Sequence, residues 1–600
     1  MKDDAPILHK DMTTMFRTAN FAKGEDTGVK GNVAGHIQIL HGDVEQGFRE
    51  ADDVIVEREL NTSMVHQGYL EPFASTAHWT ADDRVTIWTS TQNAFGMRST
   101  VAAIIDVPES QIKIVPMEVG GGFGGKGTGY FEPVIAVLSK KSGRPVKLVM
   151  SRQEVFEGTG PTSGAFMRCK IGADKSGRIT AAQLWMAYEA GAYPGSPVAG
   201  GAFPAFGAYK IDNLLVDGYD VVCNRPKTQS YRPPGQPQSA FAVETVMDEL
   251  AEKLGMDPLD LRLLNAVEEG DRAPTGLRHT RFGCKEVEEA MRDHPHYNAP
   301  LSGPNQGRGV AVGYRMHAGG NGSSATIHVN DNGTVNLVTG SADLSGSRVS
   351  LNMQVAEALG LEADDVKPSV VDTDSIGFTS GSFGSRITFD TGRAAISAAD
   401  DAVSQMKERA ALLWEVQPED VEFDDGQFIC TKNTDDRFTF KELAGHLAGT
   451  GGVGPQLAGN IVDVEVDPET GKVEILRFTA FMDVGQVVHR DNVEGQMQGG
   501  ALQGIGWALN EEYYYNDSGN MLNISLLDYR MPTTLDLPMI DTVIIEVPNP
   551  RHPFGIRGVG ESPIVPPLAA LANAVHAATG VRMTSLPMSP GSILEAINKK

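Results

Sequence analysis

The segment Met117–Tyr130 reads M-E-V-G-G-G-F-G-G-K-G-T-G-Y, and the interpretation of the whole chain depends on it. Glycine occupies five of the six positions from 120 to 125, and Phe123 is the exception. The residues before it, Gln111–Val119, alternate as in a strand, and Phe131–Lys141 is apolar at helical spacing. A strand that enters a helix through bare backbone lets main-chain N–H groups approach a ligand at the helix N-terminus. A tight turn without a ligand fits the same pattern.

Two nucleotide-binding motifs match this loop in part. The spacing G-x-G-x-x-G over residues 120–125 matches the dinucleotide fingerprint, but the next strand, Val146–Met150, is not followed by the acidic residue that the motif needs about 20 residues on. Addition of Lys126 nearly makes a phosphate loop, but Gly127 stands where Ser or Thr would bind magnesium. A nucleotide-binding enzyme, P-loop or NAD-dependent, is therefore an alternative.

The composition predicts a large cytoplasmic protein with more than one core. The chain has 600 residues, 41% of them hydrophobic, and a net charge of −26, which argues against a nucleic-acid partner. No apolar run reaches the ~18 residues of a membrane span, and the N-terminus has no signal-peptide pattern. The four cysteines are far apart, so we expect no iron–sulfur cluster and no structural zinc on this chain: Cys169, Cys223, Cys284 and Cys430.

The periodicity predicts an α+β fold with antiparallel and mixed sheets and interleaved helices. Short strands recur on either side of turns rich in Asp, Asn and Gly, at 173–177, 330–333, 468–471 and 516–519. Helices are predicted at 243–254, from Pro258, at 392–414 and at 567–579. Residues 1–32 lack a clear period and are predicted to be an N-terminal extension. The Pro, Gly and Asn cluster near residue 298 separates two halves of similar size, 33–298 and 299–600.

Three further glycine-rich stretches occur, at 376–386, 495–506 and 555–561. Each glycine inside a helix costs ~1 kcal/mol relative to alanine, so the repeats in the helical stretch 495–506 imply that something approaches the backbone closely. Four glutamines add amide donors and acceptors that suit a large polar heterocyclic cofactor: Gln92, Gln496, Gln498 and Gln503.

Five motifs occur together in one order: S-T-Q-N at 90–93, G-G-G-F-G-G-K at 120–126, Y-R-P-P-G-Q-P-Q at 231–238, V-E-G-Q at 493–496 and G-V-G-E at 558–561. In these segments the chain resembles the molybdenum-cofactor-binding subunit of the xanthine oxidase/aldehyde oxidase family, from about residue 33 to the C-terminus. The resemblance implies one molybdenum on molybdopterin, usually the cytosine dinucleotide form in bacterial members. It also implies that the cofactor lies between the two halves and that the second half carries the catalytic glutamate.

The activity implied is oxidative hydroxylation of an electron-poor carbon, in an N-heteroaromatic ring or an aldehyde, with oxygen from water. Glu561 of G-V-G-E matches the family's catalytic base, and Gln92 and Arg232 match residues beside the metal. The metal is held by the pterin and not by side chains. The residues implied to bind the cofactor are Gln92, Gly122, Phe123, Gly124, Arg232, Ser345, Gly346, Gly384, Ser385, Gln496, Gly560 and Glu561.

Each of these assignments has a structural alternative. Glu561 also suits a carboxylate at the start of a helix, where the dipole favours it. Arg232 also suits a surface or inter-strand ion pair. Ser345 and Gly346 stand where many members have G-Q-G, which puts that contact in question.

Departures from the family pattern narrow the substrate. Gly127 stands where xanthine-active members have Glu, and Gly200 where an ungapped alignment places their purine-binding Arg. Pro234 replaces their stacking Phe, and Pro233 stands where carbon-monoxide-oxidising members have Cys. We therefore predict aldehydes or uncharged N-heteroaromatics rather than xanthine, and no copper-bridged site.

Partner chains follow from the same resemblance. Oxidation of substrate releases two electrons, and the chain has neither a cysteine cluster nor a convincing flavin motif. We expect an iron–sulfur subunit, a flavin subunit carrying FAD, and a small chain in place of the N-terminal domain with which relatives usually begin. A truncated or unusual lineage is the alternative to the small chain. Nucleic acid and direct membrane insertion are not expected. A family member that binds no metal and has no activity is a second alternative.

Overall fold

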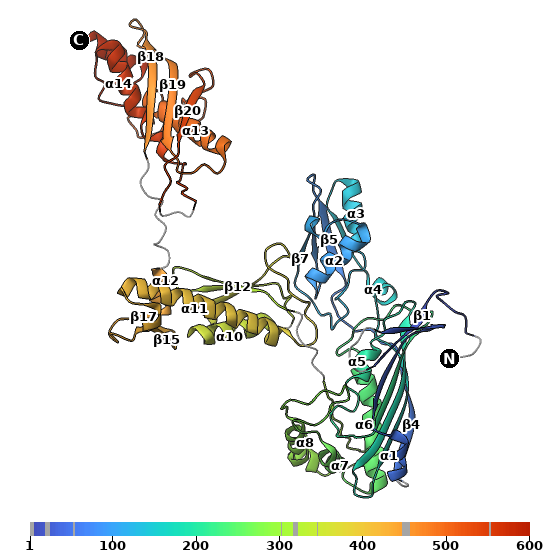
Figure 1. Cartoon of the computed structure of the whole chain (residues 1–600). Coiled ribbons are helices and arrows are strands. Elements are labelled where there is room, and N and C mark those ends of the chain that lie inside the picture. The colour runs from blue at the N-terminus through green and yellow to red at the C-terminus, as the bar shows by residue number, and fades with distance from the viewer. Residues whose placement is uncertain are drawn as a thin grey trace. The chain divides into compact units, whose positions relative to one another are not determined.

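The computed structural model describes residues 5–18, 24–51, 54–301, 303–315, 322–344, 346–446, 457–550 and 554–600. The chain divides into two compact units, Met1–Leu447 and Ala448–Lys600. Both units combine helices with sheets, so the predicted α+β class is confirmed (Figure 1). Among the described residues, no helix is both long and apolar enough to cross a membrane.

A seven-stranded mixed sheet forms the largest layer of the first unit, in the order β2-β1-β3-β11-β10-β9-β4. Its strands are β1 (Thr13–Thr18), β2 (Glu25–Lys30), β3 (Val33–His41), β4 (Ile55–Thr62), β9 (Ala165–Ala173), β10 (Ile179–Gly191) and β11 (Leu214–Val222). Helices α5 (Val198–Ala202) and α6 (Gln236–Leu254) pack on one face, and α1 (Val44–Glu50) contacts β9 and β10. The predicted apolar stripe of α6 is buried, and the helix ends at Gly255 in a left-handed conformation.

Residues 13–18 and 25–30 form β1 and β2 at the edge of this sheet, although no clear period was found in them. Their strand character was not visible in the sequence, since all residues of β2 are exposed and polar residues predominate. Pairing with β3 holds β1, and the Phe16 ring lies 5.1 Å from the His36 ring. From there a row of aromatic rings crosses the sheet on to Tyr219, Trp185 and Phe166, with centroids 4.3 to 5.8 Å apart.

A second sheet, in the order β7-β6-β5-β8, carries the central glycine loop. Its strands are β5 (Ala74–Trp79), β6 (Val85–Thr89), β7 (Ile112–Pro116) and β8 (Val146–Val149). Helices α2 (Ala94–Ile105) and α3 (Glu132–Ser142) pack on it, and α4 (Arg152–Gly158) follows β8. The strand, loop and helix predicted around residues 120–125 are thus confirmed, with β7 before the loop and α3 after it.

The rest of the first unit contains two three-stranded sheets, β12-β13-β14 and β15-β16-β17, together with helices α7 to α12. The strands are β12 (Ala325–Val329), β13 (Val335–Thr339), β14 (Val366–Val370), β15 (Val421–Asp424), β16 (Gln427–Cys430) and β17 (Arg437–Thr439). The helices are α7 (Pro258–Asn265), α8 (Cys284–Asp293), α9 (Pro295–Asn298), α10 (Ser347–Leu359), α11 (Gly392–Trp414) and α12 (Phe440–Gly445). The predicted helices at 258 and 392–414 are confirmed, and Asp257 caps α7.

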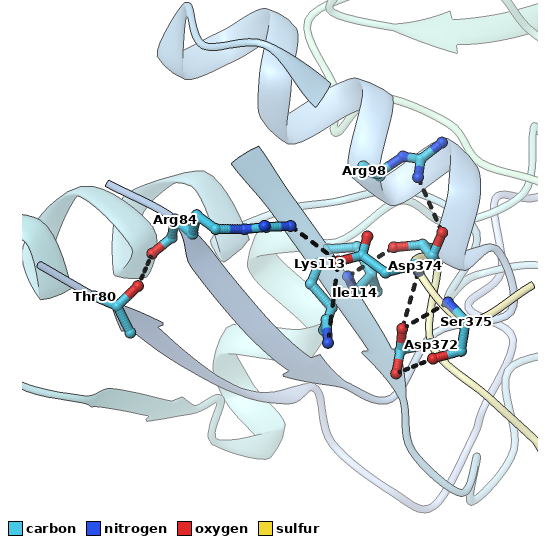
Figure 2. Close-up of polar contacts among 9 residues, drawn as sticks. Thr80, Arg84, Arg98, Lys113, Ile114, Asp372, Asp374 and Ser375 are labelled. Carbon is cyan, nitrogen blue, oxygen red and sulfur yellow. Dashed lines mark hydrogen bonds and ion pairs between the residues drawn. The ribbon is translucent and has the colours of Figure 1, made fainter. Parts of the chain in front are cut away.

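The segment after β14 docks on the edge strand β7, as Figure 2 shows. Thr373 exchanges hydrogen bonds with the backbone of Ile114, through its N–H at 3.1 Å and its Oγ1 at 3.1 Å. Asp374 lies 3.3 Å from the Arg84 guanidinium, and Asp372 accepts bonds from the turn that follows. This docking fixes residues 376–386 beside the loop that leaves β7.

The second unit is a three-stranded sheet, β18-β19-β20, covered by helices α13 and α14. Its elements are β18 (Ala458–Val466), β19 (Val473–Asp483), α13 (Arg490–Leu509), β20 (Ile540–Ile545), α14 (Pro567–Thr579) and α15 (Pro590–Asn598). Val462, Val464 and Val466 are half-buried and the acidic residues between them are exposed, as the alternation predicted. Gly580 ends α14 in a left-handed conformation, at the predicted position.

Candidate functional site

A cavity of about 770 Å³ opens in the first unit, within the usual range for small-molecule sites. Three segments supply most of its wall: the central glycine loop, residues 230–234, and residues 382–388 of the second glycine-rich stretch. Seven of the predicted site residues line it together: Gln92, Gly122, Phe123, Gly124, Arg232, Gly384 and Ser385. They come from segments almost 300 positions apart in the sequence.

Gln92 joins the two glycine-rich segments. Its side chain is 3% exposed and accepts a hydrogen bond from the Gly124 N–H at 2.9 Å, while its amide donates to the Ser382 carbonyl at 3.2 Å. Its backbone carbonyl accepts from the Ser382 N–H at 2.7 Å, and its own N–H donates to the Lys126 carbonyl at 2.9 Å. Gln92 therefore fixes the position of both walls of the cavity.

Lys126 points away from the cavity into the protein interior. Its ammonium group is fully buried, forms an ion pair with Glu71, and lies 5.2 Å from the centre of the Tyr69 ring. The same Glu71 oxygen accepts hydrogen bonds from the Gly120 N–H and the Ser90 hydroxyl, each at 2.7 Å. Glu71 therefore ties the start of the glycine loop to its end.

Burial and the ion pair together shift the pKa values of both side chains. Burial lowers the pKa of Lys126, and the attraction of Glu71 offsets this only in part. Burial acts to raise the pKa of Glu71, but the hydrogen bonds from Lys126, Ser90 and the Gly120 N–H outweigh it and leave that pKa below its usual value. Both groups are held in the charged form by each other.

The N-terminus of α3 is occupied by a side chain of the chain itself. The buried Glu132 carboxylate accepts from the N–H groups of Tyr130 and Phe131 at 3.0 and 3.3 Å, and from the Ser75 and Thr89 hydroxyls at 2.8 and 3.0 Å. At these two N–H groups the strand–loop–helix pattern therefore makes a contact within the protein, as in the alternative of a turn without a ligand. With Lys126 also buried, neither element of a phosphate loop can reach a phosphate, and the nucleotide-binding interpretation loses its basis.

The donors that remain open belong to the loop backbone. Within the described part of the chain, the N–H groups of the cavity wall that find no acceptor include those of Gly121, Gly122, Phe123, Gly384 and Ser385. Gly122 is buried and Gly121 half-buried, whereas Phe123, Gly384 and Ser385 are exposed. Buried N–H groups are normally paired, so the open donors of Gly121 and Gly122 suit a polar ligand. Phe123 at φ 52° and Gly124 at φ 100° turn the loop toward the cavity, and a Cβ on Gly124 would lie 2.9 Å from the Ser230 carbonyl.

Three arginines line the cavity, and they differ in their partners. Arg386 is 6% exposed and bound to Asp390 at 3.0 Å. Arg232 and Arg315 are exposed, and no ion pair or side-chain hydrogen bond of theirs occurs among the described residues. The alternative role of Arg232 in an ion pair is therefore not seen there. Arg315 was missed at the sequence level, because no motif surrounds it.

The positions that distinguish this chain from xanthine-active members have steric neighbours. Pro233 and Pro234 line the cavity. A Cβ on Gly127 would lie 2.7 Å from the ring of Phe383, which also lines the cavity, and one on Gly200 would lie 2.1 Å from the Pro234 carbonyl oxygen. A side chain at either glycine would push against the cavity wall.

Gly346 is not among the residues that line the cavity. Gly346 precedes α10 in a left-handed conformation, and a Cβ there would meet nothing within 4 Å. Ser345 lies outside the described residues. Their neighbours Leu344 and Ser347 do line the cavity.

The other three predicted residues lie in the second unit. Gln496 is on α13, with Oε1 4.0 Å from the place of a Cβ on Gly560, so the structure brings these two together. Glu561 is exposed, precedes a single 3₁₀ turn (Ser562–Ile564), and makes no capping hydrogen bond through its side chain. Glu561 therefore stands at a helix start, as its structural alternative requires, but its side chain makes no capping hydrogen bond there.

The glycines of α13 have two explanations. A Cβ on Gly500 or Gly504 would lie 2.7 Å from Pro563 or Pro567, so these two glycines allow a tight contact within the protein. A Cβ on Gly495 or on Gly499, one turn later, would meet nothing within 4 Å. Only the first half of the helix, which also carries Gln496, leaves its backbone open.

Comparison with known proteins identifies the family. Residues 26–266 and 288–538 each match the model of a molybdopterin cofactor-binding domain. The xanthine dehydrogenase molybdenum-binding subunit of Escherichia coli O157:H7 is 31% identical, over 94% of this chain and 80% of that protein. The aldehyde oxidoreductase molybdenum-binding subunit PaoC of the same organism is 29% identical, over 93% and 77%. The crystal structure of quinoline 2-oxidoreductase from Pseudomonas putida 86 superposes with a TM-score of 0.65 at 25% identity, over 96% of this chain and 80% of that one.

The chain therefore belongs to the xanthine oxidase family of molybdenum-binding subunits, and it is a molybdopterin-dependent oxidoreductase, the catalytic subunit of a molybdenum hydroxylase. The resemblance drawn from the five motifs is confirmed. The cavity fits the cofactor in kind, since it offers neutral backbone donors, an oriented glutamine amide and two arginines without acidic partners in the described chain.

Proposed function

We propose that this chain oxidises an aldehyde or an electron-poor N-heteroaromatic carbon according to RH + H₂O → ROH + 2 H⁺ + 2 e⁻. The observation that carries the proposal is the cavity wall, where open N–H donors surround the fixed side chain of Gln92. When bound, the molybdenum cofactor supplies the two-electron oxidation.

The first unit is proposed to hold and orient the cofactor. Gln92 can still donate one amide hydrogen while its other contacts hold the loop. The N–H groups of Gly122, Phe123, Gly384 and Ser385 provide neutral donors. Preorganised donors of this kind stabilise charge without rearranging during the reaction.

Arg232, Ser345 and Gly346 complete the proposed set in the first unit. Arg232 is supported by its place on the cavity wall and by the lack of a partner among the described residues. Its guanidinium can hold an anionic group by two parallel hydrogen bonds. For Ser345 and Gly346 the support is the motif position.

Glu561 is proposed to be the general base, with Gln496 and Gly560 as cofactor contacts. The attacking oxygen derives from water and must lose its proton as it bonds to carbon, and a carboxylate within hydrogen-bond reach can accept that proton. Glu561 is suited to this role because its side chain is exposed and free of a capping bond. The two domains are proposed to span 33–298 and 299–600.

Electrons are proposed to leave through partner subunits with iron–sulfur clusters and FAD. The four cysteines support this, because they lie on separate elements and are free: two are buried in β9 and β16, and the others follow β11 and begin α8. One relative of this chain is named as subunit gamma of the 6-hydroxypseudooxynicotine dehydrogenase complex of Paenarthrobacter nicotinovorans. The cofactor is proposed to be the cytosine dinucleotide form.

Metal and pterin analysis of the complex purified from its own host tests the proposal. We expect molybdenum stoichiometric with the chain, a pterin that releases CMP on acid hydrolysis, and bleaching of partner iron–sulfur absorbance when an aldehyde is added. Absence of molybdenum from a folded complex would contradict the proposal and favour a member without metal. Full turnover by the isolated chain with a physiological acceptor would contradict the partners.

A further inference from the structure

Arg315 is a cationic residue on the cavity wall that none of the sequence motifs includes. Its guanidinium lies beside the turn at Gly384, where a Cβ would be 3.6 Å from its terminal nitrogen. Gly384 and Ser385 are both left-handed, with φ of 64° and 59°. The arginine therefore faces the same open backbone donors as the proposed cofactor site.

The backbone before Arg315 is anchored at two points. The Val312 N–H donates to the Glu244 carboxylate at 2.9 Å, and Glu244 is itself fixed by the fully buried Arg262 at 2.9 Å. The ring of Tyr314 packs against Gly207, where a Cβ would be 2.1 Å from it. Because the backbone is already fixed, binding of a ligand by Arg315 orders only its side chain.

The charge of the cavity wall is opposite in sign to the net charge of the chain. The protein carries a net charge of −26, yet the described residues that line the cavity include no Asp or Glu. Arg386 is neutralised by Asp390, so Arg232 and Arg315 contribute two positive charges without counter-charge in this wall. Cations in a partly closed site attract anions, and a guanidinium fits the two oxygens of a carboxylate or phosphate.

We propose that Arg315 recognises an oxyanion in this cavity, and that the preferred substrates are aldehydes or N-heteroaromatics that carry a carboxylate. The proposal rests on the proposed function, because the cavity is taken as the place where substrate and cofactor bind. A phosphate of the cofactor is the other source of the same oxyanion chemistry. The expectation of uncharged substrates came from Gly127 and Gly200 and did not include Arg315.

The test compares Arg315→Met with the matched control Arg168→Met in the intact complex. Arg168 is an exposed arginine on β9, outside this cavity, so its loss changes the net charge equally. Three measurements are made on each protein: the ratio of kcat/KM for 4-formylbenzoate to that for benzaldehyde, the molybdenum and pterin content, and calorimetric binding of benzoate against benzamide. The third needs no turnover.

A charged hydrogen bond of this kind predicts a 10- to 100-fold fall in the kcat/KM ratio and in benzoate affinity for Arg315→Met, with no fall for Arg168→Met. This result supports a substrate carboxylate. Loss of molybdenum and pterin with an unchanged ratio supports the cofactor phosphate instead. If neither aldehyde is oxidised while benzoate binding still depends on Arg315, the proposed reaction fails and the oxyanion site stands. The proposal would be overturned if Arg315→Met left the kcat/KM ratio, the molybdenum and pterin content, and the benzoate affinity all unchanged.

Discussion

The buried ion pair of Lys126 and Glu71 yields a local prediction about the central glycine loop. Glu71→Gln keeps the size of the side chain and an oxygen for the Ser90 and Gly120 hydrogen bonds, but it removes the charge opposite the fully buried Lys126. Removal of one partner from a buried pair costs about 3–5 kcal/mol. Because the Glu71 side chain is 33% exposed, solvent screens part of this, and we expect about 2–3 kcal/mol.

Hydrogen exchange measures this loss where it occurs, without assuming two-state unfolding of a large protein. The amide of Gln92, which donates to the Lys126 carbonyl, and the amides of Gly124 and Gly125 should exchange about 30- to 160-fold faster in the variant. The control Glu59→Gln breaks an exposed pair with Arg168 and should change exchange by no more than about fivefold.

The pH dependence gives an independent test. The folded pKa of Lys126 is already lowered, and without Glu71 it falls further. Between this lower value and the folded pKa of Lys126 in the unsubstituted protein, the folded variant has released a proton that its unfolded chain still binds. Over this window the stability of the variant rises with pH while that of the unsubstituted protein does not, so the deficit of the variant shrinks. The exchange rates measured at pH 7 and at pH 9 are each divided by the intrinsic exchange rate at that pH, and the two quotients are then compared.

Two results would refute this reasoning. One is exchange of the loop amides in Glu71→Gln that matches Glu59→Gln. The other is a double variant, Glu71→Gln with Lys126→Met, that remains as unprotected as the single one, since removal of both charges should restore most of the protection.

Three further predictions concern the reaction. Glu561→Gln should slow single-turnover reduction of the metal by ~10²–10⁴-fold and leave the molybdenum content normal. The control Glu474→Gln, at an exposed residue, should not slow this reduction. Loss of molybdenum from Glu561→Gln would show that Glu561 has a structural role instead. Xanthine should have a lower kcat/KM than the best aldehyde or N-heterocycle in a steady-state panel, and the opposite order would show that the alignment of the purine positions is wrong. Gly124→Ala should lower the cofactor content of an otherwise folded protein. The φ of 100° at Gly124 and the Ser230 carbonyl oxygen 2.9 Å from the new Cβ make the substitution cost about 1–3 kcal/mol or more. An unchanged cofactor content would mean that the loop adapts.

The elements that the sequence predicted well depend on local physics. Helix α11 and helix α14 begin and end where periodicity, proline and glycine place them, and the Asp257 cap of α7 is a contact between near neighbours. The α+β class followed from the mixture of the two periods. The turn-linked strand pairs β9–β10 and β18–β19 also formed as expected, because their hairpin turns are encoded in four or five residues.

The features that escaped prediction depend on residues far apart in the chain. Strands β1 and β2 are held by pairing with β3, not by their own composition. Glu71 precedes its partner Lys126 by 55 positions, and no motif joins them. Contacts with Gly207 and Glu244 hold the backbone before Arg315 in place. No local sequence pattern connects either of these residues to Arg315.

The direction of one side chain separates two functions that share a local sequence. In a phosphate loop the lysine must face the ligand, whereas here Lys126 is turned inward and the carboxylate of Glu132 fills the helix N-terminus. What the loop offers the cavity is therefore a set of neutral N–H donors and the ring of Phe123, and the positive charge comes from Arg232 and Arg315 on other segments. A neutral donor surface with charge at separate points suits an extended polar cofactor better than a compact triphosphate. Glu71 and Glu132 distinguish the phosphate loop from the cofactor-binding loop. Both residues lie outside the motif, so the glycine pattern alone could not decide between the two functions.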